Sequence, residues 1–288
     1  KVGFDLSAPL RQGRAYLGSR EWFGAARRMF SYAKDPLSLD ELEVKMHMSK
    51  YSEQALKYKR ELGLTQLGET FTQREEQYGS KLIDKIPLLR GSERAFTGFL
   101  TDLRFNRFVN ILERLDRAGR GITDNPKAMK DLAQVIGAST GRGTLGSAEG
   151  AARPLATVLF SPRWVASRIE MLTNPFTKSG PARIEAARSL ATLAGTSVAI
   201  LGMAKMAGAD VETDPRSSDF GRIKIGNTRF DITGGMAPYI ILIARLVTRS
   251  TKSSTTGTVM ILNGSAFNAR TEFDVLTDFV TNKASPMA

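Results

Sequence analysis

The longest regular pattern in the sequence runs over residues 92–118 and predicts an α-helix. Apolar side chains recur there mostly three and four residues apart, which is the spacing of a helix face. The apolar arc is wide, so we expect this helix to be contacted on more than one side. Its apolar members are Phe96, Phe99, Leu100, Leu103, Phe108, Ile111, Leu112 and Leu115. The pattern favours a mainly α fold, a multi-helix elongated or bundle-like assembly.

Further helices are predicted between breaks made of Pro, Gly and Asn. They cover residues 21–34, 38–62, 69–78, 125–137, 161–172, 181–207, 236–248 and 271–282. Ser38-Leu39-Asp40-Glu41 has the sequence of a capping box, and Asn125-Pro126 supplies an N-cap followed by Pro at the first turn. Asn174-Pro175 is expected to interrupt the chain, residues 4–18 to form an extended arm, and residues 250–256 to form a loop.

One small β-hairpin is predicted near residues 222–232, where Gly226-Asn227 separates two short alternating segments. The Gly-rich residues 137–150 are the expected internal boundary. They would separate an N-terminal helical region, 1–136, from a C-terminal helical region with the hairpin, 151–288. The chain starts at Lys1 and ends on Ser285-Pro286-Met287-Ala288, and we expect it to be part of a longer protein.

The chain is basic, with a formal net charge of +12. Each half carries +6, because residues 1–150 hold 25 Lys and Arg against 19 Asp and Glu, and residues 151–288 hold 16 against 10. A positive field spread in this way favours DNA, RNA or an anionic membrane surface as a partner. The alternative is a soluble protein whose acidic partner surfaces lie on neighbouring chains.

The sequence contains few residues that would support catalysis, cofactor binding or metal binding. The chain has no Cys, which excludes disulfides, thiolate metal sites and a Cys nucleophile, and its one His, His47, has no second His for a metal. Gly141 to Gly146 match the letters of a dinucleotide motif, but a predicted helix and not a strand precedes them. The acidic segment 210–219 lacks the Gly and the closing Glu of a calcium loop, so a loop paired with Arg216 and Arg222 is favoured. We expect no enzyme activity and no cofactor.

Five arginines are candidate polyanion contacts. Four of them form a slowly drifting stripe on the helix 92–118, and the fifth lies in the Gly-rich segment: Arg104, Arg107, Arg114, Arg117 and Arg142. Such a stripe can follow phosphates. It can equally pair with Asp102, Glu113 and Asp116 as a solvated or interhelical salt-bridge face, which the interleaved carboxylates favour.

Residues 189–204 carry no charged side chain and are rich in Ala, Leu, Ile, Val and Gly. The run is about one turn short of the roughly 20 residues that usually span a bilayer, so a buried helix of a soluble protein is favoured and membrane insertion stays open. Small residues at helical spacing would allow another helix to approach closely, in a membrane or in an oligomer. They are Ala191, Gly195, Ala199 and Gly202.

Several segments together resemble a known group of phage proteins. They are Thr140-Gly141-Arg142-Gly143 with Leu145-Gly146, the run from Leu159 to Arg168, and above all the run from Gly208 to Gly221 that continues from Lys224 to Ile232. Over about residues 130–288 the chain resembles the C-terminal region of large polyvalent proteins of tailed bacteriophages. Some of these are internal virion proteins that are ejected with the genome.

The resemblance implies a structural segment that is packaged in the virion interior and delivered with the DNA to the host envelope or cytoplasm. Expected partners are copies of the chain and other virion proteins, such as portal or ejection proteins, with DNA and membrane as further candidates. Two alternatives stay open: a basic nucleic-acid-binding effector delivered to the host, and a non-catalytic part of a larger multi-enzyme phage protein.

Overall fold

The fold is described from a computed structural model that covers residues 8–64, 87–146, 161–264 and 270–284. It is mainly α, 66% helical, with small antiparallel strand pairs, which confirms the predicted fold class. The described residues divide into two compact units. Residues up to 146 and from 161 to 192 form unit 1, and residues from 193 onward form unit 2.

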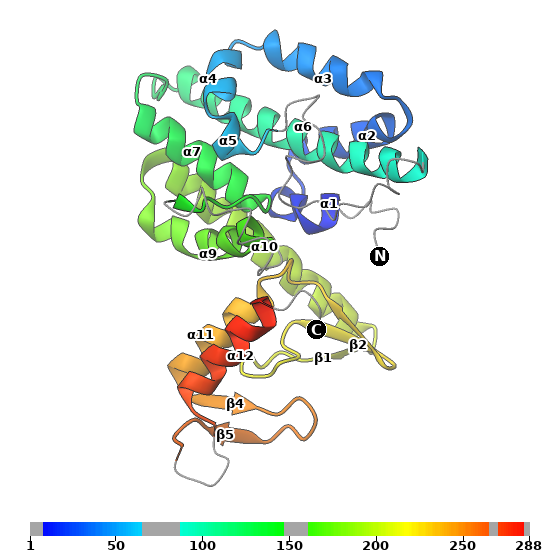
Figure 1. The fold of residues 1–288 in the computed structure, drawn as a ribbon, viewed down its shortest axis with the longest axis vertical. Coiled ribbons are helices and arrows are strands. Elements are labelled where there is room, and N and C mark those ends of the chain that lie inside the picture. The colour runs from blue at the N-terminus through cyan, green and yellow to red at the C-terminus, as the bar shows by residue number, and fades with distance from the viewer. Residues whose placement is uncertain (1–7, 65–86, 147–160, 265–269, 285–288) are drawn as a thin grey trace. The chain divides into compact units, whose positions relative to one another are not determined.

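Unit 1 is built around the long helix α6, Pro87–Arg117, which packs most extensively on α2, Arg20–Lys34. Shorter elements surround this pair (Figure 1). They are α1 (Ala8–Arg11), η1 (Gly13–Tyr16), α3 (Leu37–His47), α4 (Ser52–Lys57), α5 (Lys59–Leu62), α7 (Pro126–Ser139) and α9 (Pro162–Thr177). The first part of α10, Gly180–Met206, completes the unit.

Capping side chains fix two of these helix starts, and the cap at Asn125 was predicted. The Ser19 hydroxyl accepts a hydrogen bond from the Trp22 amide (3.1 Å) at the start of α2. Asn125 Oδ1 accepts one from the Ala128 amide (3.0 Å) at the start of α7. Each bond satisfies one of the amides that the first helical turn leaves without a partner.

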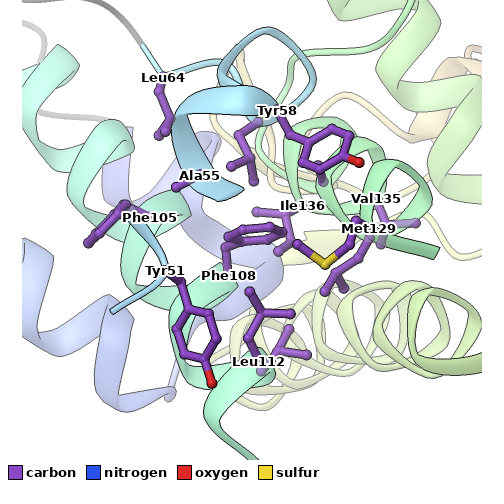
Figure 2. Close-up of a cluster of buried hydrophobic side chains, with 14 of the residues drawn as sticks. Tyr51, Ala55, Tyr58, Leu64, Phe105, Phe108, Leu112, Met129, Val135 and Ile136 are labelled. Atoms are coloured by element: carbon purple, nitrogen blue, oxygen red, sulfur yellow. The ribbon is translucent and has the colours of Figure 1, made fainter. Parts of the chain in front are cut away.

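The core of unit 1 joins α6 to helices from distant parts of the chain. Figure 2 shows Phe105, Phe108 and Leu112 of α6 meeting Tyr51 and Ile136. A second buried cluster lies between α6 and α2, around Phe99 and Leu103. Burying each large apolar side chain contributes about 1.5–3 kcal/mol, so this core stabilises the unit substantially.

Several predicted boundaries in unit 1 were wrong. The helix expected over 38–62 is three pieces, α3 to α5, because Tyr51 turns inward at the break and its hydroxyl donates to Asp116 on α6. Ser38 does not cap a helix; its hydroxyl donates to the Asp35 carbonyl (2.6 Å). The expected extended arm, 4–18, contains α1 and η1, and Pro175 lies inside α9 instead of ending it. The predicted helix 69–78 lies outside the described residues.

The Gly-rich segment is packed and is not where the two units divide. Its residues 137–139 belong to α7, Gly141 (φ +90°) lies against the Trp164 ring, and the Gly143 amide donates to the Arg163 carbonyl (3.0 Å). These contacts join α7 to α9 within unit 1. The remaining residues of the predicted joint, 147–150, lie outside the described ranges.

Unit 2 contains the second part of α10 and two small sheets. The predicted hairpin is present as β2 (Arg222–Ile225) and β3 (Thr228–Asp231), with Ile225 opposite Thr228. Strand β1 (Asp210–Val211) pairs with β2 to make three strands. A second hairpin, β4 (Ser250–Lys252) with β5 (Val259–Ile261), occupies part of the expected loop. Helices α11 (Ala237–Thr248) and α12 (Glu272–Ala284) pack on each other (Figure 1).

Candidate functional site

The arginine stripe on α6 is not one exposed surface, which corrects the prediction for its first two members. Arg104 is buried and its guanidinium donates to the Gly63 carbonyl (2.7 Å) and to Thr140 Oγ1 (2.7 Å). Arg107 is buried as well and is bound to carboxylates. The wide apolar face of α6 carries both side chains into the interior, so neither can meet a polyanion in this fold.

Arg107 is the centre of a buried charge cluster that joins three helices of unit 1. Its Nε and Nη2 donate to the two oxygens of Glu185 on α10 at 2.7 and 2.8 Å. Nη1 lies 3.4 Å from Glu21 on α2, which also accepts from Asn110 (2.9 Å). The bidentate geometry suits a guanidinium and a carboxylate. Arg107 thus forms an interhelical salt bridge, but its partners are Glu185 and Glu21 and not the predicted Asp102, Glu113 or Asp116.

Arg107 and Tyr16, two groups of this cluster, have shifted pKa values. Burial lowers the pKa of Arg107, but the hydrogen bonds and charge of Glu185 outweigh it and raise the pKa above its usual range. Burial and the charge of Glu185 also raise the pKa of the Tyr16 hydroxyl, whose ring lies against the Arg107 guanidinium at 5.2 Å. These shifts hold Arg107 in its charged form and the Tyr16 hydroxyl in its neutral form between the helices that they join.

The other candidate arginines lie apart from one another. Arg114 and Arg117 are exposed on the last turns of α6, where Arg117 pairs with Glu113 (3.6 Å). Arg142 is half-buried beside Gly63 in the packed Gly-rich segment. The five residues therefore do not form a common surface for nucleic acid.

His47 and the acidic segment, the remaining candidates, have neighbours that can pair with them. His47 is exposed, 3.8 Å from Glu43, and no group of three or more His, Asp or Glu side chains suited to a metal occurs in the described part of the chain. In the acidic segment Asp214 pairs with Arg216 (2.8 Å) and Asp219 with Arg222 (3.0 Å). These are the two arginines predicted as partners of that loop.

Helix α10 is the clearest candidate interaction surface. Its first part buries Ala182, Glu185, Ala186, Ser189 and Leu193, which recur at three, four and seven residues and form one face. From residue 194 to the end of the helix no side chain is fully buried. The prediction of a buried helix was therefore wrong for this second part.

The small residues predicted for helix packing all lie exposed on α10. They are Ala191, Gly195, Ala199 and Gly202. A Cβ added at Gly195 or Gly202 would meet no heavy atom of the described residues within 4 Å. Large apolar side chains on the same part of the helix are also exposed, Val198, Met203 and Met206 among them.

Length and composition also make α10 a candidate membrane span. Among the described residues it is the one helix long and apolar enough to cross a bilayer, with mean hydropathy 1.3 and 11% of the apolar window buried. The helix exceeds the uncharged run counted in the sequence because the regular structure continues from residue 180 to 206. Either a second helix or lipid could cover such a surface.

Unit 2 exposes further apolar side chains on every kind of element that it contains. They include Ile225 and Phe230 on the β2–β3 hairpin, Val259 and Ile261 on β5, Ile243 and Val247 on α11, and Phe273 and Val280 on α12. Sequence analysis missed this surface. The available signal was that the apolar residues of α12 occupy a wide arc, which is more surface than one neighbouring helix covers.

The chain is matched by no family model, no curated protein and no solved structure. The resemblance to internal virion proteins of phages therefore stays a prediction.

Proposed function

We propose that this chain is a structural segment of a phage internal virion protein, packaged in the particle and delivered with the genome. Its mode of action in this proposal is assembly, in which α10 of one copy packs on α10 of another. The observation that carries the proposal is the exposed apolar surface of α10. The sequence resemblance supplies the phage context.

The exposed surface of α10 suits contact with a second copy of the chain better than other exposed parts of the molecule do. The net charge of +12 makes copies repel each other wherever their basic surfaces meet. Residues 189–204 carry no charge, so two α10 helices can approach along this run without opposing like charges. Small residues at positions 195, 199 and 202 allow a close approach, and a twofold pair uses the same surface on both copies.

The first test introduces a charge on this surface. Val198 on α10 and Val44 on α3 are both exposed, at 68% and 57%. We expect Val198→Asp to weaken self-association of the full chain by tenfold or more, measured by sedimentation equilibrium. Val44→Asp is the matched control, with the same substitution at an exposed helical Val of unit 1, and should leave the association constant unchanged.

A second variant adds bulk without charge. Gly195→Leu fills the space needed for a close helix approach, while Leu favours the helix over Gly by roughly 1 kcal/mol. Association should fall although α10 becomes more helical by circular dichroism. A wild-type chain that remains monomeric, or variants that associate normally, would contradict self-assembly. If the chain instead floats with lipid vesicles, and this depends on Val198, then the partner of α10 is a lipid bilayer and not a second copy.

The phage context needs its own test. Mass spectrometry of purified particles of the phage that encodes the chain should detect it in a fixed stoichiometry with the portal protein. Its absence from intact particles would refute the virion role while leaving the α10 association result standing.

A further inference from the structure

A pocket of about 670 Å³ lies wholly within unit 2. One face of α11 and one face of α12 form two of its walls, with Leu242 and Arg245 on the first and Asp278 and Phe279 on the second. The β4–β5 hairpin, β2, Ser218 and Arg270 supply the rest. The volume falls in the range of about 300–1,000 Å³ that is usual for small-molecule sites.

Four cationic side chains from four different segments line this pocket: Arg222, Arg245, Lys252 and Arg270. Three of them have carboxylate partners, since Arg222 pairs with Asp219 (3.0 Å), Lys252 with Glu212 (2.8 Å) and Arg270 with Asp278. Asp278 is the one acidic residue among the described lining residues. With these three cations paired, the unbalanced positive charge of the lining comes from Arg245.

Arg245 differs from the other three. Its Nε donates to the Arg216 carbonyl (2.8 Å), and within the described ranges its guanidinium forms no ion pair with a carboxylate. Burial lowers its pKa, and the positive charge of Arg270 lowers it further against the opposing effect of Asp278. Two guanidinium groups thus repel each other across a half-buried site, and an anion between them would relieve that repulsion.

The same pocket has an apolar wall. Leu242 and Phe279 line it beside the cationic groups, and Phe279 is held in place by edge-on packing against Tyr239, with ring centroids 5.4 Å apart. A ligand that satisfies both walls has an anionic group and a carbon skeleton. Arg binds phosphate oxygens in a bidentate manner, which makes a phosphate ester the anion of choice.

We propose that this pocket binds an organic phosphate ester, with the phosphate between Arg245 and Arg270 and the carbon skeleton against Leu242 and Phe279. The phosphate displaces part of the Arg270–Asp278 contact and gives Arg245 the anionic partner that it lacks. A free nucleotide and a phospholipid headgroup both carry this chemistry. The inference does not depend on association through α10.

Titration calorimetry on the full chain tests the pocket at 150 mM salt, which screens diffuse charge. The probes are ATP, pyrophosphate, and vesicles of phosphatidylglycerol or phosphatidylcholine. We expect Arg245→Gln to weaken binding at least about tenfold, the effect of losing a hydrogen bond to a charged group. Arg249→Gln removes the same charge from an exposed arginine just after α11 that is not among the lining residues, and should change binding less than twofold.

The probes also distinguish the two sources of phosphate. Binding of ATP above pyrophosphate, lost in Arg245→Gln, indicates a soluble ester that uses the apolar wall. Binding to phosphatidylglycerol vesicles alone, with the same dependence on Arg245, indicates a lipid headgroup. Arg245→Lys keeps the positive charge, and its circular dichroism should match that of the wild type if the fold is unchanged. Equal losses in Arg245→Gln and Arg249→Gln, or binding of no probe, would overturn the proposal.

Discussion

The two units differ in how completely they bury their apolar side chains. In unit 1, α6 is enclosed by helices and buries Phe99, Leu103 and Phe108 completely. In unit 2 the described residues bury few apolar side chains, Tyr239, Leu262 and Val275 among them, and expose many others. Exposed apolar side chains gathered in this way mark interaction surfaces, so we expect a partner to cover part of unit 2.

This contrast also separates two kinds of arginine. In unit 1 a buried arginine, Arg107, already holds the two carboxylates that neutralise it. In unit 2 the half-buried Arg245 has a main-chain partner and a neighbouring like charge. The first arrangement is complete within the chain, and the second would be completed by an anion.

The largest expected effect comes from breaking the Arg107 cluster. Arg107→Met leaves Glu21 buried without its cation and Glu185 with only the exposed Arg188 at 3.7 Å, and it should lower the free energy of unfolding of unit 1 by about 3–5 kcal/mol. Urea unfolding followed by Trp fluorescence measures this, because both tryptophans of the chain, Trp22 and Trp164, lie in unit 1.

Arg117→Met is the matched control for this prediction. It removes an exposed pair with Glu113 and should change the stability by less than about 1 kcal/mol. Combining Arg107→Met with Glu185→Leu should recover part of the loss, since the second change removes one stranded charge. Equal effects of Arg107→Met and Arg117→Met would mean that the buried cluster does not stabilise unit 1.

Matched truncations compare the two cores directly. Leu103→Ala in unit 1 should cost about 3–5 kcal/mol, because the surrounding helices cannot close the cavity. Leu262→Ala in unit 2 should cost about 2 kcal/mol or less, because it lies beyond β5 in a thinly covered unit that can collapse around it. Hydrogen exchange resolved by unit gives both values, and similar losses would refute the difference in packing.

A smaller effect is expected at the hairpin turn. Gly226 has a φ of +58°, and a β-branched residue there is strained by about 1–2 kcal/mol. Gly226→Val should therefore accelerate amide exchange in β2 and β3 while leaving unit 1 unchanged. Gly202→Val, at a helical glycine with open space around it, is the control and should leave the hairpin amides protected.

The smallest effect concerns pH. Hydrogen bonds from Arg216 hold the pKa of Asp214 at about 2, below its usual 3.8. Because the pKa is lowered in the folded state, this stabilisation is present above about pH 4 and is lost as the pH falls towards 2. Pepsin cleavage in residues 212–222 should rise over that interval in the wild type. Asp214→Asn should show faster cleavage already at pH 4 and a flatter pH dependence.

Local signals in the sequence predicted much of this fold. Asn125 and Gly226-Asn227 each act through neighbours a few residues away, so the start of α7 and the hairpin could be located. The break at Tyr51 could not, because its partner Asp116 is 65 residues away.

The candidate site shows the same limit. The burial of Arg104 and Arg107 depends on Gly63, Thr140 and Glu185, which helical periodicity cannot bring together. The exposure of the small residues on α10 likewise depends on what packs there, which composition alone does not reveal.

The Arg107 cluster also sets an order of events during synthesis. Glu185 follows Arg107 by 78 residues, so translation at roughly 5–20 residues per second delays their meeting by about 4–16 s. Throughout this interval Arg107 has only Glu21, made 86 residues earlier, as an acidic partner in the cluster. Until Glu185 is made, the positive charge of Arg107 between α2 and α6 is only partly neutralised. Unit 1 can therefore reach its final state only after the beginning of α10 has left the ribosome.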